Sequence, residues 1–525
     1  MRSLLAALAA LVLCAPFVAA AKYLAFRSAV SRQESAPPAT ADGRRAALPP
    51  VRSPAGSAPP VVLAYHDVGP ARGPYTVTPR LLDRQLAALR KAGYHSLTSE
   101  EFLGALHGDR VPDRSVYLTF DDGTHGLWVH ADAVLARHRM HGAVFVITGS
   151  VGTHRPYYLS WQEIGRMARS GRWDFQDHTR ATHRRARIDA AGHRGSALTD
   201  RIWLPAAGRT ETPAEYRRRV AADLDASVAD LTGHGLPRPR LFAYPFSESG
   251  ERTNLPGGGM LPGLLRERFA AALTNSHPLP LPAGPRAAAA GLVRRIEVRR
   301  TTTAGELLRQ VAEQREVPAG AVRHPLRDAA GWRSATDAGP VTAAMFTGAA
   351  PVPAGRSRIS APYRPHATAD WTDYTATATA DRLRSPSDTA ALTVRSGGLH
   401  PLTVTLSAMA AVLDEGPGGG HRSQRLLRTG GRHTVRVTVT GDRTVVAVDG
   451  RRLWERRHRW RPAAQGNGGI ALTVREGRGD GRWPRLTHLT VTPAARPPHT
   501  GHPPHRTAPP AGPALLPARP APGVT

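Results

Sequence analysis

Short apolar runs recur through the first half of the chain. Runs of four or five mostly apolar residues, bounded by polar or turn-forming residues, are typical of strands buried on both faces of a parallel sheet. These runs occupy residues 61–64, 116–120, 143–147 and 241–244, and Phe175 marks a further strand.

Amphipathic segments lie between these runs. Leu82, Leu86 and Leu89 recur at the spacing of one helical face, which predicts a helix with that face buried. Ser160 and Glu163 form a capping box, which predicts the start of a second helix. This alternation of strands and helices favours an α/β domain, either a (β/α) barrel or a doubly wound parallel sheet.

The second half of the chain has strand signals without a convincing helix. Residues 433–449 alternate valines with polar residues on both sides of a Gly-Asp turn, which is the pattern of a β-hairpin. We therefore expect an antiparallel β-sandwich. Its further strands are expected at residues 391–395, 402–406, 470–475 and 486–492.

Segments rich in proline, alanine and glycine separate these regions. Such segments cannot bury a core and behave as tethers or tails. The resulting division is an export segment, a linker, an α/β domain, a second linker, a β-sandwich and a proline-rich tail. Their residues are 1–25, 26–60, 61–316, 317–358, 359–492 and 493–525.

The N-terminal segment predicts the compartment. Residues 4–21 form an apolar run between Arg2 and Lys22, the pattern of a secretory signal peptide or of an uncleaved signal anchor. We expect an exported protein, either extracellular or attached to the cell envelope, with membrane anchoring as one of the two alternatives.

The basic charge adds little to this description. The 70 Lys and Arg residues against 41 Asp and Glu give a formal net charge of +29, but Lys22 and Lys91 are the only lysines. The arginines are spread along the chain and do not form one basic patch, so we do not expect a nucleic-acid partner.

Cysteine usage excludes several kinds of chemistry. The single cysteine, Cys14, lies in the N-terminal apolar run. The domains therefore contain no disulfide, thiolate metal site or cysteine nucleophile. Any metal must be bound by histidine and carboxylate side chains.

The sequence VYLTFDDG, at residues 116–123, delivers two adjacent carboxylates at the end of a predicted strand. In an α/β barrel the reactive groups collect at this end of the strands. A second strand end, at residues 173–183, presents His178 and His183. With Asp122 they would provide two nitrogens and one oxygen, the ligand set of a catalytic zinc, and Asp121 would be free to act as a base.

Two more strand ends carry polar or aromatic groups. His66 follows the strand at residues 61–64, and Tyr244 ends the run at residues 241–244. Either residue alone would be read as structural, but four strand ends with such groups favour a site.

Four segments together resemble the polysaccharide deacetylase family, carbohydrate esterase family four. The resemblance is strongest to the branch that deacetylates poly-β-1,6-N-acetyl-D-glucosamine, which has a His–His spacing of five and a Tyr-His motif. It covers residues 61–314 and also includes RRIEV at residues 294–298. The four segments are AYHDV, LTFDDG, FQDHTRATH and FAYPF, at residues 64–68, 118–123, 175–183 and 242–246.

The resemblance implies a deformed (β/α) barrel with a divalent metal, usually zinc, on Asp122, His178 and His183. It further implies that Asp121 is the general base and that His66 protonates the departing amine. The loop of Tyr244, Pro245 and Phe246 would contact substrate, with a backbone N–H near Phe246 stabilising the oxyanion.

Two positions depart from the family's pattern. Ser247 stands where the family has a glycine, so the path of the loop after Phe246 is open. Asp177 stands where the family has a small residue, and this extra carboxylate either supports the metal site or is exposed.

The expected activity is the metal-dependent release of acetate from an extracellular N-acetylglucosamine polymer of a biofilm matrix. Two alternatives stay open: an N-deacetylase of chitin or peptidoglycan, and a degenerate enzyme that only binds polysaccharide at the cell surface.

The second domain loosely resembles concanavalin-like jelly-roll modules. Four tryptophans there, if exposed, could stack on sugar rings, although placement in the core is the preferred interpretation. They are Trp371, Trp454, Trp460 and Trp483.

Overall fold

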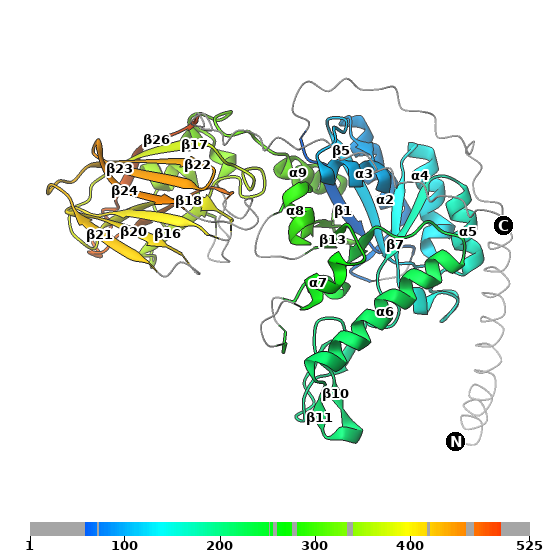
Figure 1. The fold of residues 1–525 in the computed structure, drawn as a ribbon. Coiled ribbons are helices and arrows are strands. Elements are labelled where there is room, and N and C mark those ends of the chain that lie inside the picture. Colours follow the sequence, from blue (N-terminus) through cyan, green and yellow to red (C-terminus); the bar gives the residue numbers. More distant parts are fainter. Residues whose placement is uncertain are drawn as a thin grey trace, which may run out of the picture.

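The computed structural model describes residues 58–494, except for 71–72, 251–252, 256–259, 276–280, 333–339, 399, 417–420 and 458–466. The predicted export segment, nearly all of the first linker and of the proline-rich tail, and Trp460 lie outside the described residues. None of the helices in the described part of the chain is long and apolar enough to span a bilayer. The described residues form two lobes of different architecture (Figure 1).

A nearly closed parallel sheet forms the centre of the first lobe. Its strand order is β14-β13-β12-β7-β6-β5-β1-β15, with β4 also paired to β5. The strands β14 and β15 lie at opposite ends of this order, yet only Arg295 separates them along the chain, so the two ends of the sheet meet there. The structure is the expected deformed (β/α) barrel and excludes the doubly wound sheet. The strands are β1 (Val61–Tyr65), β4 (His95–Ser96), β5 (Ser115–Asp122), β6 (Gly142–Val146), β7 (Trp173–Asp177), β12 (Leu241–Ala243), β13 (Ala271–Thr274), β14 (Val293–Arg294) and β15 (Ile296–Glu297).

Helices cover the outside of this sheet, and the two predicted from sequence are present. Leu82, Leu86 and Leu89 are fully buried on one face of α2. Ser160 and Glu163 form the predicted capping box of α5, in which each side chain accepts a backbone N–H of the other residue. The helices are α2 (Pro79–Lys91), α3 (Ser99–His107), α4 (Asp132–His138), α5 (Trp161–Arg169), α6 (Pro213–Gly233), α7 (Met260–Arg266), α8 (Pro285–Ala290) and α9 (Ala304–Gln314).

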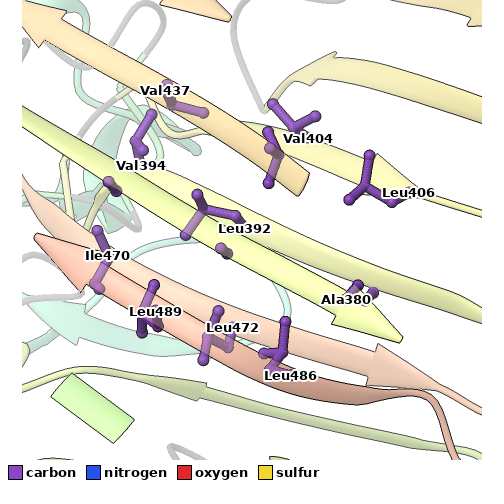
Figure 2. Close-up of a cluster of buried hydrophobic side chains, with 14 of the residues drawn as sticks. Ala380, Leu392, Val394, Val404, Leu406, Val437, Ile470, Leu472, Leu486 and Leu489 are labelled. Carbon is purple, nitrogen blue, oxygen red and sulfur yellow. The ribbon is translucent and has the colours of Figure 1, made fainter. Parts of the chain in front are cut away.

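The second lobe is the expected antiparallel sandwich, made of two sheets with the orders β16-β25-β18-β19-β20-β21 and β24-β23-β22-β17-β26. Aliphatic side chains from both sheets meet in its core (Figure 2). The strands are β16 (Arg358–Pro362), β17 (Tyr374–Asp381), β18 (Thr389–Ser396), β19 (Leu402–Leu406), β20 (Ala410–Glu415), β21 (Arg422–Leu426), β22 (His433–Thr440), β23 (Arg443–Val448), β24 (Arg451–Arg457), β25 (Gly469–Arg475) and β26 (Arg485–Pro493).

The segment 317–358, expected to be a linker, belongs in part to the sandwich. Trp332 and Phe346, the latter in α10 (Ala343–Thr347), are buried in the sandwich core. Hydrophobic burial by these two rings explains why the segment packs despite its composition.

The tryptophans considered for sugar stacking are largely part of the same core. Trp371 and Trp454 are buried, and Trp483 packs against the core with part of its surface exposed. The preferred interpretation as core residues therefore holds for Trp371 and Trp454, and neither ring is available to a sugar.

Polar contacts join the two lobes. Arg286, in α8, forms an ion pair with Asp370 and donates to the carbonyl oxygen of Ala369 at 2.9 Å. Arg294, in β14, donates to Nδ1 of His366 at 3.1 Å. The sandwich is thus attached beside the point where the barrel closes.

Candidate active site

The predicted site residues follow strands that run in one direction. β1, β5, β7 and β12 are all parallel members of the barrel sheet, so their C-terminal ends lie at the same edge. His66 follows β1, Asp121 and Asp122 end β5, His178 follows β7, and Tyr244 follows β12.

The structure brings Asp122, His178 and His183 together. One ligand atom from each lies within 4.8 Å of the others. Oδ1 of Asp122 is 3.6 Å from Nε2 of His178 and 3.6 Å from Nε2 of His183. Ligand atoms at about 2.0–2.2 Å from a tetrahedral ion lie about 3.4 Å apart, so these separations fit a shared divalent cation.

The imidazole of His178 is held in the form that a metal ligand needs. Its Nδ1 lies 2.8 Å from the carbonyl oxygen of Ala243, which places the proton on Nδ1 and leaves the lone pair on Nε2 facing Asp122. Burial lowers the pKa of His178 to about 4, so the ring is neutral at neutral pH. Two imidazoles and one carboxylate match the donor set of a catalytic zinc.

The turn after β5 presents Asp122. Asp122 and Gly123 have φ values of 73° and 74°, in the left-handed region that carries the chain sharply out of the strand. The segment before α5 holds this turn, because the N–H of His125 donates to the carbonyl oxygen of Tyr157 at 2.8 Å. Nε2 of His125 also lies 3.0 Å from Oε1 of Glu163, the buried carboxylate of the capping box.

Asp121 is buried and paired with Arg295. Both guanidinium NH groups donate to its two carboxylate oxygens at 2.7 Å, and the Arg295 side chain is 0% exposed. Nε of Arg295 donates to Oδ1 of Asn275 at 2.7 Å, which fixes the plane of the guanidinium. Burial alone would raise the pKa of Asp121, but the charges of Arg295, His178 and His66 together hold it below its usual range.

His66 lies on the same side of the barrel as Asp121. Its ring contacts the ring of Tyr75 at a centroid distance of 4.8 Å. Nδ1 of His66 is buried without a hydrogen-bond partner. An imidazole with one ring nitrogen not engaged in a hydrogen bond can exchange a proton with a bound molecule.

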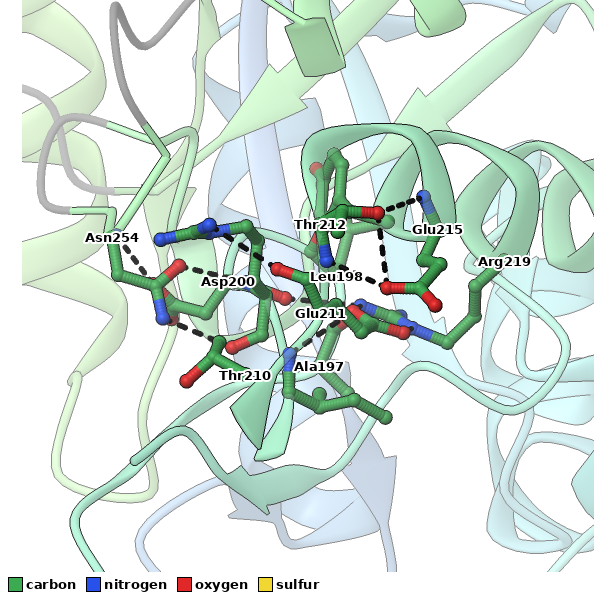
Figure 3. A network of polar contacts seen from close by, with 12 residues as sticks. Ala197, Leu198, Asp200, Thr210, Glu211, Thr212, Glu215, Arg219 and Asn254 are labelled. Atoms are coloured by element: carbon green, nitrogen blue, oxygen red, sulfur yellow. Dashed lines mark hydrogen bonds and ion pairs between the residues drawn. The ribbon is translucent and has the colours of Figure 1, made fainter. Parts of the chain in front are cut away.

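An insertion between β7 and α6 follows His183 in the chain. It begins with the hairpin of β8 (Arg185–Arg187) and β9 (Arg194–Ser196), and continues with β10 (Trp203–Leu204) and β11 (Arg209–Thr210). Arg219 of α6 ties the insertion down, because it donates to Glu211 and to the carbonyl oxygens of Ala197 and Asp200 (Figure 3). Along the chain, His183 thus lies between β7 and an insertion that is bound to α6.

The loop after β12 places its three predicted residues differently. Tyr244 is buried, and its hydroxyl donates to the carbonyl oxygen of Gly291 at 3.1 Å, so its side chain belongs to the core. Pro245 is also buried, while Phe246 is 41% exposed and its ring lies 4.7 Å from the His183 ring. Phe246 and Ser247 have φ values of 57° and 58°, so the chain takes a left-handed path here without the family's glycine.

Asp177 is fully buried, which excludes the exposed alternative for this carboxylate. Its Oδ1 accepts the N–H of Thr179 at 2.7 Å and so stabilises the turn that carries His178. Burial raises the pKa of Asp177 to about 7.

Comparisons with known proteins agree with this geometry. The polysaccharide deacetylase family model matches residues 108–255. The chain is 28% identical over 183 residues to the poly-β-1,6-N-acetyl-D-glucosamine N-deacetylase of Escherichia coli strain K12, covering 32% of this chain and 27% of that protein. It is 30% identical over 112 residues to the protein of the same name from Staphylococcus aureus strain MSSA476, covering 21% of this chain and 39% of that protein.

Among solved structures, IcaB from Ammonifex degensii is 26% identical, with a TM-score of 0.39, and the match covers 49% of this chain and 97% of that chain. This chain spans about a quarter to two fifths of the length of the two curated relatives described above. The family match includes β5, β7 and β12, three of the four strands whose ends form the site. Over residues 108–255 the barrel of this chain is therefore similar to the polysaccharide deacetylase family.

Proposed function

We propose that this chain is a metal-dependent N-deacetylase that hydrolyses the N-acetyl groups of an exported N-acetylglucosamine polymer and releases acetate. One observation carries the proposal above the others. Asp121, held by Arg295, directly precedes Asp122 of a two-histidine, one-carboxylate donor set. A proton acceptor beside a candidate cation site supports metal-dependent hydrolysis of an amide.

Asp122, His178 and His183 would hold the cation, and zinc best suits two imidazoles and one carboxylate. A cation bound there would lower the pKa of a water molecule and would polarise the acetamide carbonyl. Asp121 would accept the proton of the attacking water, and Arg295 would keep its carboxylate oriented for that step.

His66 and the β12 loop would act on the other atoms of the amide. His66 would donate a proton to the departing amine, which leaves as a glucosamine unit. The N–H groups of Ser247 and Glu248 are already engaged by the carbonyl oxygens of Tyr244 and Pro245. The N–H of Phe246 is therefore our choice for the oxyanion donor.

The substrate is proposed from the names of the two curated relatives, which act on poly-β-1,6-N-acetyl-D-glucosamine. A polymer of this kind lies outside the cytoplasm, which agrees with the export segment expected at residues 1–25. We therefore propose an extracellular or envelope location and a role in a biofilm matrix.

The test is acetate release by the full chain from acetylated glucosamine oligomers of equal length with β-1,6 or β-1,4 linkages. Faster release from the β-1,6 oligomer supports the proposal. Faster release from the β-1,4 oligomer would make the chain a chitin- or peptidoglycan-type deacetylase. Retention on a polymer column without acetate release would support the degenerate binding protein.

A further inference from the structure

Large exposed aromatic rings gather around the proposed active site. Among the residues that the structure describes, the exposed large hydrophobic side chains are Tyr75, Tyr157, Phe246, Met409 and Leu426. The three aromatic ones all belong to the barrel and lie beside the site, Tyr75 and Tyr157 in turns and Phe246 in the short 3-10 helix Pro245–Ser247. The two aliphatic ones belong to the sandwich. Exposed apolar surface concentrated at one place indicates a binding surface.

Two of these rings contact residues with proposed roles in the chemistry. The Tyr75 ring lies 4.8 Å from the ring of His66, the proposed acid. The Phe246 ring lies 4.7 Å from the ring of His183, a proposed metal ligand. The two rings therefore stand at different strand ends of the same site.

Tyr157 stands beside the third strand end. Its carbonyl oxygen accepts the N–H of His125 in the turn that follows Asp122, and its ring packs edge-on against Tyr158 at 4.8 Å. The Tyr157 side chain is still 52% exposed. Burial of part of the ring, and then the negative charges of Asp122 and Asp67, raise the pKa of its hydroxyl to about 12, which agrees with a position close to Asp122.

Two of the rings are each covered by an arginine, and each of these arginines forms an ion pair with a glutamate. This arrangement restrains the rings and adds no net charge to the surface. The pairs are Arg185–Glu248 over Phe246, with 4.3 Å from guanidinium carbon to ring centroid, and Arg299–Glu297 over Tyr75, with 5.7 Å.

We propose that Tyr75, Tyr157 and Phe246 form an aromatic rim that binds the sugar units next to the reacting unit of the polymer. This inference rests on the proposed deacetylase function. The electron-rich faces of aromatic rings attract the C–H groups on the apolar face of a pyranose. A surface whose charges are paired suits uncharged N-acetylated units and disfavours a polyanion.

The test measures kcat and KM for the full chain on acetylated β-1,6-glucosamine oligomers of one to five units and on a small aryl acetate ester. Tyr75→Ala and Tyr157→Ala should each lower kcat/KM for the pentamer about five- to tenfold, since a stacked ring contributes about 1 kcal/mol. The same variants should leave kcat/KM for the aryl ester within about twofold of the parent. Tyr75→Phe and Tyr157→Phe should restore the pentamer value, because the ring and not the hydroxyl makes the contact.

Leu426→Ala is the control, because it removes an even more exposed apolar side chain from the sandwich and should change the kinetics on neither substrate. Equal losses on pentamer and ester in the alanine variants would overturn the rim, since they would indicate a structural defect in the site. Unchanged kinetics on both substrates would also overturn it. A parent protein that cleaves the ester but releases no acetate from any oligomer would refute the proposed function, and the rim with it.

Discussion

Replacing Arg295 by glutamine should damage both the stability of the barrel and its chemistry. Arg295 is 1% exposed, and its side chain makes two 2.7 Å bonds to the Asp121 carboxylate. Glutamine cannot supply two parallel charged donors, so the variant leaves a buried carboxylate without its counter-ion. Breaking a buried pair in this way costs about 3–5 kcal/mol.

This loss of stability should be measurable as a decrease in Tm. For a barrel of this size, about 3–5 kcal/mol corresponds to a decrease of roughly 6–20 °C in the Tm of the first transition. Burial would then raise the pKa of Asp121 without the opposing charge of Arg295, and a protonated Asp121 cannot accept a proton. Acetate release should therefore fall at temperatures where the variant is still folded.

The assay combines differential scanning calorimetry with acetate release at 15 °C. Arg395→Gln is the control, because Arg395 is also 1% exposed but lies in the sandwich, where it contacts the carbonyl of Gly441 and the hydroxyl of Thr444. It should lower the stability of the sandwich and leave acetate release unchanged. An Arg295→Gln variant with the Tm and activity of the parent would refute the roles in stability and catalysis that we assign to the Arg295–Asp121 pair.

Two further predictions concern the turn that presents Asp122. Interactions that include the contact with His125 lower the pKa of Glu163 from 4.5 to about 2, so this carboxylate stabilises the fold above pH 4.5 and loses that contribution as the pH falls towards 2. In urea titrations, Glu163→Gln should lower the unfolding free energy by about 1–3 kcal/mol at pH 7 and should reduce the loss of stability at acid pH. An unchanged pH dependence of stability would contradict this role of Glu163. A methyl group on Gly126 would overlap the carbonyl oxygen of Val68, so Gly126→Ala should reduce both Tm and acetate release. The control is Gly263→Ala, in α7, where nothing lies near the added methyl group and Tm should be equal to that of the parent or slightly higher. Equal Tm values for the two variants would refute the steric argument.

Much of the barrel and its candidate cation site could be predicted because both depend on local patterns. The apolar run before Asp121 fixes a buried strand, and the parallel direction of such strands places their ends together. His178 and His183 follow the next-but-one strand, so the fold class brings them to the same edge of the sheet as Asp122.

Other parts depend on contacts that no local pattern records. Arg295 reaches Asp121 across 174 positions of sequence, and its only signal was membership in the RRIEV segment of the family resemblance. Tyr75 and Tyr157 lie in turns, where no periodicity distinguishes an exposed ring from a buried one. Trp332 and Phe346 were missed as core residues because the surrounding residues have the composition of a linker.

The central claim is that this chain uses a bound divalent cation and Asp121 to release acetate from an N-acetylglucosamine polymer. The most direct test measures acetate from the β-1,6 polymer with the full chain before chelation, after chelation and after addition of zinc, beside the Asp121→Asn variant. We expect release to fall to background after chelation, to return with zinc, and to stay at background in Asp121→Asn with zinc present. Full release by the chelated protein or by Asp121→Asn would contradict the account.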